Sequence, residues 1–166
     1  MEQIEIQPDI VQLAEKKLVG KRLRMSLAND KTGELWRSFM MDRKGIPNAV
    51  GANLYSMQSF DPGYFEKFDP RNEFEKWAVA EVADFNSVPA GMEAKVLPAG
   101  RYAVFHYKGS SANGAHIFQY IFGKWLPGSE YTLDSRPHFE VLGEKYKNNS
   151  ADSEEEIWIP VKAKNS

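Results

Sequence analysis

Cysteine is missing from all 166 residues of the sequence. Its absence excludes a disulfide framework and any thiolate metal site, and it is typical of proteins in a reducing compartment. Long apolar runs are also missing, so no segment is long enough to span a membrane. The N-terminal residues 1–20 mix acidic and basic side chains and lack the apolar core of a signal peptide. We therefore predict a cytoplasmic protein without a membrane partner.

An excess of positive charge is absent as well. The chain carries 21 Lys and Arg against 23 Asp and Glu, a net charge of −2, and the basic residues form no stripe. Proteins that bind nucleic acids directly usually carry a basic excess, so we expect no direct contact with DNA or RNA. Residues 1–10, which precede the first expected strand, are too few and too acidic to form a DNA-binding domain.

Sequence motifs for phosphate, dinucleotide or zinc binding are not found, and neither is the motif of a nucleophilic serine. The three histidines, His106, His116 and His138, stand apart in the sequence. Metal sites and general-base sites usually bring a histidine together with other ligands or with carboxylates. We therefore predict no metal ion and no cofactor, and we assign no catalytic residue.

Aromatic residues, in contrast, are abundant, with 4 Trp, 7 Tyr and 10 Phe making up 13% of the chain. Such side chains fill hydrophobic cores and also line ligand pockets. We expect most of them in the core, and composition alone does not separate the two uses.

Hydrophobic periodicity predicts the same order of elements twice: a strand, a helix and two further strands. Trp77 in the closing strand of the first half corresponds to Trp158 in the second half. The first half is expected to contain strands near residues 11–25, 53–60 and 74–83 and a helix from Asn29 or Asp30 to Gly45. A short strand near 93–97 is followed by strands at 101–108, 138–146 and 155–162 and by a helix with the apolar stripe 117–125.

This order predicts a single domain, residues 1–166, with pseudo-repeats at about 8–84 and 93–163. Strands interleaved with two helices indicate an α+β fold in which the helices cover one face of an antiparallel sheet. The other face is then expected to be open where the halves meet, which is a natural place for a ligand groove.

Four segments, in this order, give the sequence a family resemblance. They are residues 98–105 (PAGRYAVF), 123–127 (GKWLP), 136–140 (RPHFE) and 157–162 (IWIPVK). The series resembles the GyrI-like family, the effector-binding domain of bacterial transcription activators, and in particular its stand-alone members encoded on integron cassettes. The resemblance implies a duplicated βαββ fold with a curved antiparallel sheet and a groove between the halves. It also implies that the groove binds amphipathic, often cationic aromatic compounds.

The resemblance assigns the family's key acidic residue to Glu140. Many relatives carry a tyrosine two residues later, where this chain has Leu142. A carboxylate placed in an apolar strand loses hydration, and a bound cation would offset that cost. Aromatic rings around it would add cation–π attraction of about 0.5–2 kcal/mol for each well-placed ring. The residues that we expect to form the pocket walls are Phe39, Tyr55, Trp77, Tyr107, Trp125 and Tyr131.

Three functions follow from these expectations. The first is a ligand-binding module that acts as a stand-alone sensor, with a separate DNA-binding protein as partner, or that sequesters a cationic drug. The second is hydrolysis of cyclopropane-bearing DNA-alkylating compounds, which some GyrI-like proteins perform with a glutamate in an aromatic pocket. The third is binding to DNA gyrase, as the family name implies, although a net charge of −2 is a weak field for mimicking DNA. The sequence predicts no oligomeric state.

Overall fold

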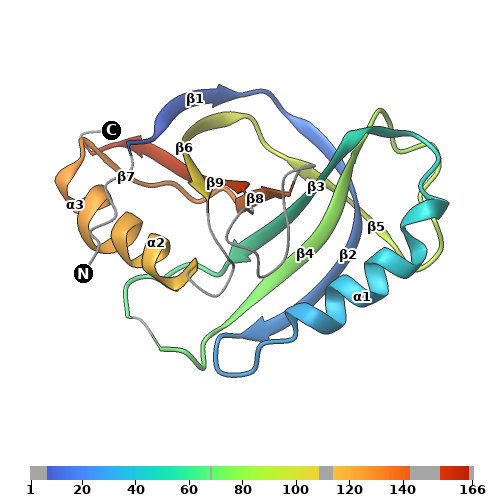
Figure 1. Cartoon of the computed structure of the whole chain (residues 1–166), viewed down its shortest axis with the longest axis horizontal. Coiled ribbons are helices and arrows are strands. Elements are labelled where there is room, and N and C mark those ends of the chain that lie inside the picture. Colours follow the sequence, from blue (N-terminus) through green and yellow to red (C-terminus); the bar gives the residue numbers. More distant parts are fainter. Residues whose placement is uncertain (1–6, 68, 109–113, 143–153, 165–166) are drawn as a thin grey trace.

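The computed structural model describes residues 7–67, 69–108, 114–142 and 154–164 of the chain (Figure 1). Its first half contains β1 (Asp9–Leu13), β2 (Lys16–Ser26), α1 (Thr32–Asp42), the 3-10 helix η1 (Arg43–Gly45), β3 (Ala49–Phe60) and β4 (Glu73–Val82). Its second half contains β5 (Glu93–Leu97), β6 (Gly100–Lys108), α2 (Gly114–Tyr120), the π-helix η3 (Ile121–Trp125), α3 (Leu126–Gly128), β7 (Tyr131–Leu133), β8 (His138–Leu142) and β9 (Glu154–Ala163). The α+β fold class expected from the sequence is confirmed.

Some boundaries differ from the sequence expectation: β3, for example, begins at Ala49 and not near residue 53. The strand expected over residues 11–25 is divided into β1 and β2. Strand β7 has only 3 residues, which is too short for a periodic signal. Strand β8 begins at His138 as expected, whereas residues 143–146 of the expected strand lie outside the described part of the chain.

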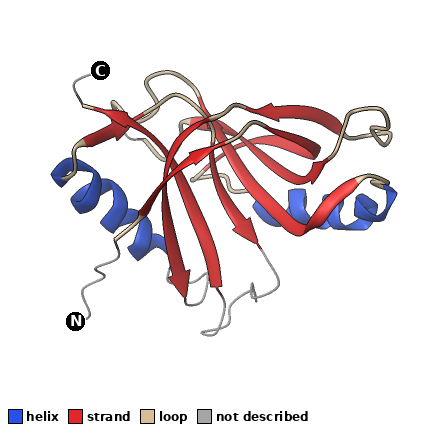
Figure 2. Cartoon of the chain, turned by 90° about the horizontal axis from the view of Figure 1, so that it is seen from above, coloured by secondary structure: helices blue, strands red, loops and turns tan. Residues whose placement is uncertain are grey.

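All strand pairs described are antiparallel, and the sheet runs in the order β1-β6-β9-β8-β3-β4-β2-β5, with β7 beside β9. Residues 14–15 connect β1 to β2 and residues 98–99 connect β5 to β6, although these strands lie at opposite ends of that order. Such short connections require the two ends to approach each other, so the sheet curls into a half-barrel (Figure 2). Gly20 permits close packing in β2, since a Cβ atom there would lie 2.0 Å from the carbonyl oxygen of Ala78.

The inner face of the curled sheet is filled by what we call the interior cluster. Side chains alternate between the two faces of a strand, so residues paired across strands share a face. Met57 pairs with Trp77 on one side and with Phe139 on the other, and Phe139 pairs with Trp158. This row places both tryptophans on the inner face. The buried members of the interior cluster are Leu13, Leu18, Tyr55, Met57, Trp77, Val79, Leu97, Tyr102, Val104 and Phe139.

The helices pack on the outer face. α1 buries Leu35 and Phe39 against the sheet, and the backbone N–H of Thr32 at its start donates to Asp30 Oδ1 at 2.9 Å. The α2–η3 segment buries Ile117 and Ile121 against β6 and β9. The expectation of helices on one face is therefore correct. The expectation that the opposite face is open is wrong, because the short connections curl the sheet and bring its inner side chains together. None of the helices in the described part of the chain is long and apolar enough to cross a membrane.

Candidate ligand-binding pocket

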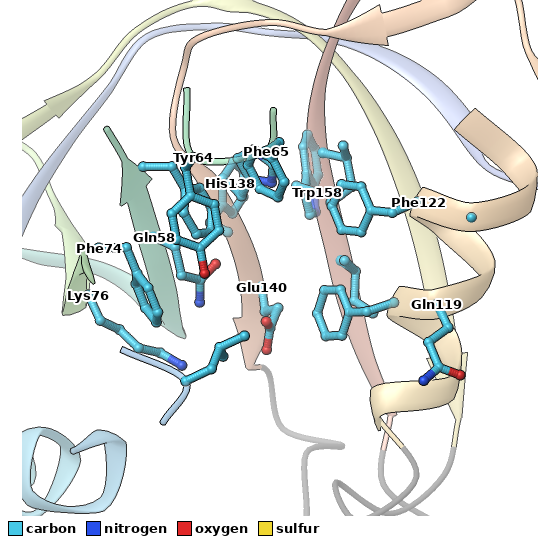
Figure 3. Close-up of a pocket in the computed structure, with 17 residues that line it drawn as sticks. Gln58, Tyr64, Phe65, Phe74, Lys76, Gln119, Phe122, His138, Glu140 and Trp158 are labelled. Carbon is cyan, nitrogen blue, oxygen red and sulfur yellow. The ribbon is translucent and has the colours of Figure 1, made fainter. Parts of the chain in front are cut away.

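A cavity of about 920 Å³ lies on the outer face of the sheet, between the parts covered by α1 and by α2–η3. Of the 17 residues that line it, those from β3, β4 and the segment between them belong to the first half of the chain. Those from α2, η3, β8 and β9 belong to the second half (Figure 3). The pocket is thus built where the two halves meet, on the face that carries the helices.

One side of the pocket is a group of stacked rings that we call the aromatic wall: Phe60, Phe65, Phe122 and His138. Phe65 stacks on Phe122 with ring centroids 5.5 Å apart and on the His138 ring at 5.4 Å. Phe60 meets His138 edge to face at 4.9 Å. Phe65 is 42% exposed although it is a large apolar side chain, so it is available to a ligand. Further rings on the lining are those of Tyr64, Phe74 and Phe118.

His138 is part of this wall as a neutral ring. Its side chain is buried, and burial lowers the pKa of His138 to about 3. An imidazole in such an environment does not carry a charge near neutral pH. It therefore presents an aromatic surface and does not repel a cation.

Glu140 is brought into the pocket by the alternation of β8. His138 and Glu140 point to the outer face, whereas Phe139 between them points into the interior cluster. Figure 3 shows the Glu140 carboxyl group extending into the space below the rings. Burial raises the pKa of Glu140, and the positive charge of Lys76 opposes that rise. A carboxylate in this position is short of compensating charge.

A second carboxyl group, that of Glu155 on β9, interacts with Glu140. The register pairs Glu140 with Ile157, so Glu155 lies two residues away on the neighbouring strand and on the same face. Burial raises the pKa of Glu155 to about 8, with further contributions from the charge of Glu140 and the hydrogen bond to it. Two adjacent carboxyl groups disfavour each other's ionisation. Near neutral pH Glu155 therefore keeps its proton, and the pair does not carry two full negative charges.

The helical side of the pocket comes from the end of α2 and the π-helical turn that follows it. The helix expected around residues 117–125 is α-helical to Tyr120 and π-helical from Ile121 to Trp125. Phe118, Gln119, Phe122 and Gly123 from this region line the cavity. π-Turns inside α-helices are frequent at functional sites because the extra residue changes the direction of the following side chains.

Of the seven residues that the sequence analysis assigned to ligand binding, Glu140 lines this cavity. Phe39 is buried under α1, and Tyr55 and Trp77 belong to the interior cluster. Tyr107, Trp125 and Tyr131 pack in the cluster between the second helical segment and the sheet. None of these six aromatic residues lines the cavity with Glu140, because strand parity or helix packing places each of them in a hydrophobic cluster.

Periodicity alone does not identify the lining residues, although some of them carry a signal in the sequence. His138 has the same strand parity as Glu140, and Phe118 and Phe122 are spaced i, i+4 beside the buried stripe of the helix. Phe65 lies in a turn-rich segment, where no periodic pattern predicts a facing direction. The partnership of Glu140 with Glu155 depends on strand register, and an acidic run such as 154–156 ordinarily reads as solvated surface.

Fold and pocket together define a small-molecule-binding α+β domain. The family model of the GyrI-like small molecule binding domain matches residues 6–162, so the chain belongs to the GyrI-like family, and the resemblance noted from the sequence is confirmed. The transcriptional regulator BrlR of Pseudomonas aeruginosa is 26% identical over 149 residues, which are 87% of this chain and 51% of BrlR. The chain thus spans about half the length of this curated relative.

Two solved structures share the fold at low sequence identity. The structure of SAV2435 bound to tetraphenylphosphonium is 18% identical, with a TM-score of 0.72 over 96% of this chain and 94% of that one. The integron cassette protein VCH_CASS2 from the mobile metagenome of Vibrio cholerae is also 18% identical, with a TM-score of 0.62 over 95% of this chain and 97% of that one.

Proposed function

We propose that this domain binds an amphipathic, cationic aromatic ligand in the pocket beneath the aromatic wall. The observation that carries the proposal is the acidic pair Glu140–Glu155 on the same face as a wall of stacked rings in which Phe65 is exposed. The rings can stack on a flat apolar ligand, and the acidic pair offsets its positive charge. The binding of tetraphenylphosphonium by the fold relative SAV2435 makes this cation a suitable first probe.

Titration of the protein with tetraphenylphosphonium by calorimetry tests the proposal. We expect Glu140→Gln to weaken binding about 30-fold, because a charge interaction on the order of 2 kcal/mol is removed from a poorly hydrated site. Glu130→Gln is the matched control, since Glu130 is exposed and lies outside the pocket. Equal affinity of the Glu140→Gln variant and the wild type would remove Glu140 from the proposed site.

We propose two roles for such binding: sensing, with the signal passed to a separate DNA-binding protein, or sequestration of a toxic cation in the cytoplasm. Both require reversible binding, but sequestration also requires the protein to be abundant relative to its ligand. Growth of cells that express the protein, in rising concentrations of a toxic aromatic cation, separates these roles. Protection that scales with protein amount and is lost in Glu140→Gln favours sequestration.

A second candidate function, hydrolysis of a cyclopropane-bearing electrophile, is favoured by the paired carboxyl groups. Burial and the charge of Glu140 raise the pKa of Glu155 to about 8, so Glu155 keeps a proton near neutral pH, and Glu140 beside it lines the cavity and can act as a general base on water when it is ionised. Incubation with such a compound, followed by product analysis, decides the matter. A ring-opened product that depends on Glu140 supports hydrolysis, and unchanged substrate eliminates it.

A further inference from the structure

Lys76 is the one lysine or arginine on the lining of the pocket in the part of the chain that the structure describes. Its strand β4 pairs with β3 so that Lys76 lies opposite Gln58, and Gln58 in turn lies opposite His138 of β8. Lys76, Gln58 and His138 therefore form a row on the outer face, next to the row that contains Glu140. Figure 3 shows the Lys76 side chain extending from its strand toward the same space as Glu140.

The ammonium group of Lys76 interacts with the carboxyl pair without being locked to it. Its positive charge acts on both Glu140 and Glu155, and also on Asp30 near the start of α1. Among the ion pairs within 4.0 Å that the described residues form, however, none includes Lys76. A lysine on a flexible four-carbon stem, in the field of carboxylates but not in contact with them, can exchange partners at little cost.

Charges of both signs therefore lie around the cavity before a ligand enters. The carboxyl pair supplies negative charge, Lys76 supplies positive charge, and the ring of His138 is neutral. A ligand with a positive charge alone must compete with Lys76 for the pair. A ligand that also carries a negative group gives Lys76 a new partner while its positive group meets the pair.

We propose that Lys76 is the resident counter-ion of the pocket and gives it a preference for aromatic ligands that carry both a positive and a negative group over ligands with a positive charge alone. This inference rests on the proposed binding function and names its ligand class more closely. Gln58 and Gln119, the amides on the lining, can accept or donate hydrogen bonds to either group and do not decide between the two charges.

Two xanthene dyes that differ in one group test the preference. Rhodamine 6G is an ethyl ester and a cation, whereas its free acid, rhodamine 19, has the same ring system and is zwitterionic at neutral pH. Both are titrated into wild-type protein, Lys76→Met and Lys76→Arg at low salt, followed by fluorescence anisotropy, and tetraphenylphosphonium is titrated by calorimetry. Lys17→Gln is the matched control for net charge, because Lys17 is exposed and outside the pocket.

We expect Lys76→Met to shift the ratio of the two dye affinities about tenfold toward the ester and to tighten tetraphenylphosphonium binding about threefold or more. Lys76→Arg and Lys17→Gln should leave the ratio close to that of wild type. If wild type binds these ligands and Lys76→Met changes neither the dye ratio nor the tetraphenylphosphonium affinity, the role of Lys76 is refuted while the proposed function stands. If wild type binds tetraphenylphosphonium and neither dye, the change in tetraphenylphosphonium affinity caused by Lys76→Met alone tests the role of Lys76, and an unchanged affinity refutes it. Failure of wild type to bind all three ligands contradicts the proposed function itself.

Thermal unfolding of each variant shows whether it is folded. Lys76 is only partly buried, so we expect Lys76→Met to unfold within a few degrees of wild type. Should it unfold much earlier, Lys76→Gln provides a second neutral variant, and the same dye ratio is the criterion.

Discussion

The two faces of the sheet both carry aromatic side chains, but they use them differently. In the interior cluster Tyr102 and Phe139 are almost fully buried, and their rings meet 5.2 Å apart within packed apolar neighbours. On the outer face, the aromatic wall leaves Phe65 42% exposed and borders a cavity that contains the carboxyl group of Glu140. The difference shows that an aromatic cluster becomes a candidate binding site when its rings stack on one another and one side of the cluster borders a cavity.

The largest effect that separates the two faces is on stability. Met57 is fully buried in the middle of the interior cluster. We expect Met57→Ala to lower the free energy of unfolding by about 2–5 kcal/mol, because it removes buried methylene and sulfur contacts and leaves a cavity. Urea denaturation measures the change. Met41→Ala, at a side chain that is 82% exposed, serves as the control and should change stability by less than about 0.5 kcal/mol. Similar losses in both variants would contradict the assignment of Met57 to a packed interior.

An intermediate effect is expected on binding when the aromatic wall is changed. Phe65→Ala should weaken tetraphenylphosphonium binding about 3- to 30-fold, because it removes one ring that stacks on Phe122 and faces the cavity. Its cost in unfolding free energy should be smaller than that of Met57→Ala, since Phe65 is half-exposed. Calorimetry and urea denaturation on the same samples give both numbers. A Phe65→Ala variant that loses stability but keeps its affinity would assign Phe65 to the core.

The smallest expected effect is on the part of the pH dependence of stability that the Glu155 carboxyl group contributes. Burial and Glu140 raise the pKa of Glu155 to about 8 in the folded protein, above its value in the unfolded chain. The folded state thus binds more protons between these values, so this stabilising contribution is present at low pH and is lost as pH rises through about 8. We expect Glu155→Gln to raise the melting temperature relative to wild type by a few degrees at pH 8.5, and much less at pH 4.

His138 also contributes to the pH dependence of stability, in the opposite direction. Because burial lowers its pKa to about 3, its stabilising contribution is present above the ordinary histidine pKa and is lost as pH falls toward about 3. Because His138 is present in both proteins, its contribution cancels when the two melting temperatures are subtracted. A difference between variant and wild type that does not change from pH 4 to pH 8.5 would mean that the carboxyl pair is not buried together.

The class of fold can be predicted from the sequence, and the residue predicted as the acid, Glu140, lines the cavity, whereas the aromatic residues of the lining cannot be predicted. The periodicities of 2 and 3.6 predict most strands and both helical regions, and the ordered motifs lead to Glu140. The face of the sheet to which a side chain points is harder to predict, because a strand that is buried on both faces shows no alternation of polar and apolar residues. Trp77 in β4 illustrates this: its neighbours Ala78 and Val79 are buried on opposite faces, and only the register with Met57 places the tryptophan inside.

The position of the pocket depends on a global property that no local pattern contains. Residues 14–15 and 98–99 look like ordinary short connections, yet they join opposite ends of the sheet and force it to curl. The curl closes the face that was expected to be open and leaves the gap between the two helical segments as the pocket. For the same reason Lys76 reaches the pocket and Glu155 reaches Glu140, through strand pairings between distant parts of the chain.

A crystal structure of the protein grown with tetraphenylphosphonium tests the central claim most directly. The account predicts ligand density in the cavity, with phenyl rings against Phe65 and Phe122 and with the Glu140–Glu155 pair as the nearest anionic groups. Density for the ligand elsewhere on the protein, with the cavity holding only water, would contradict it.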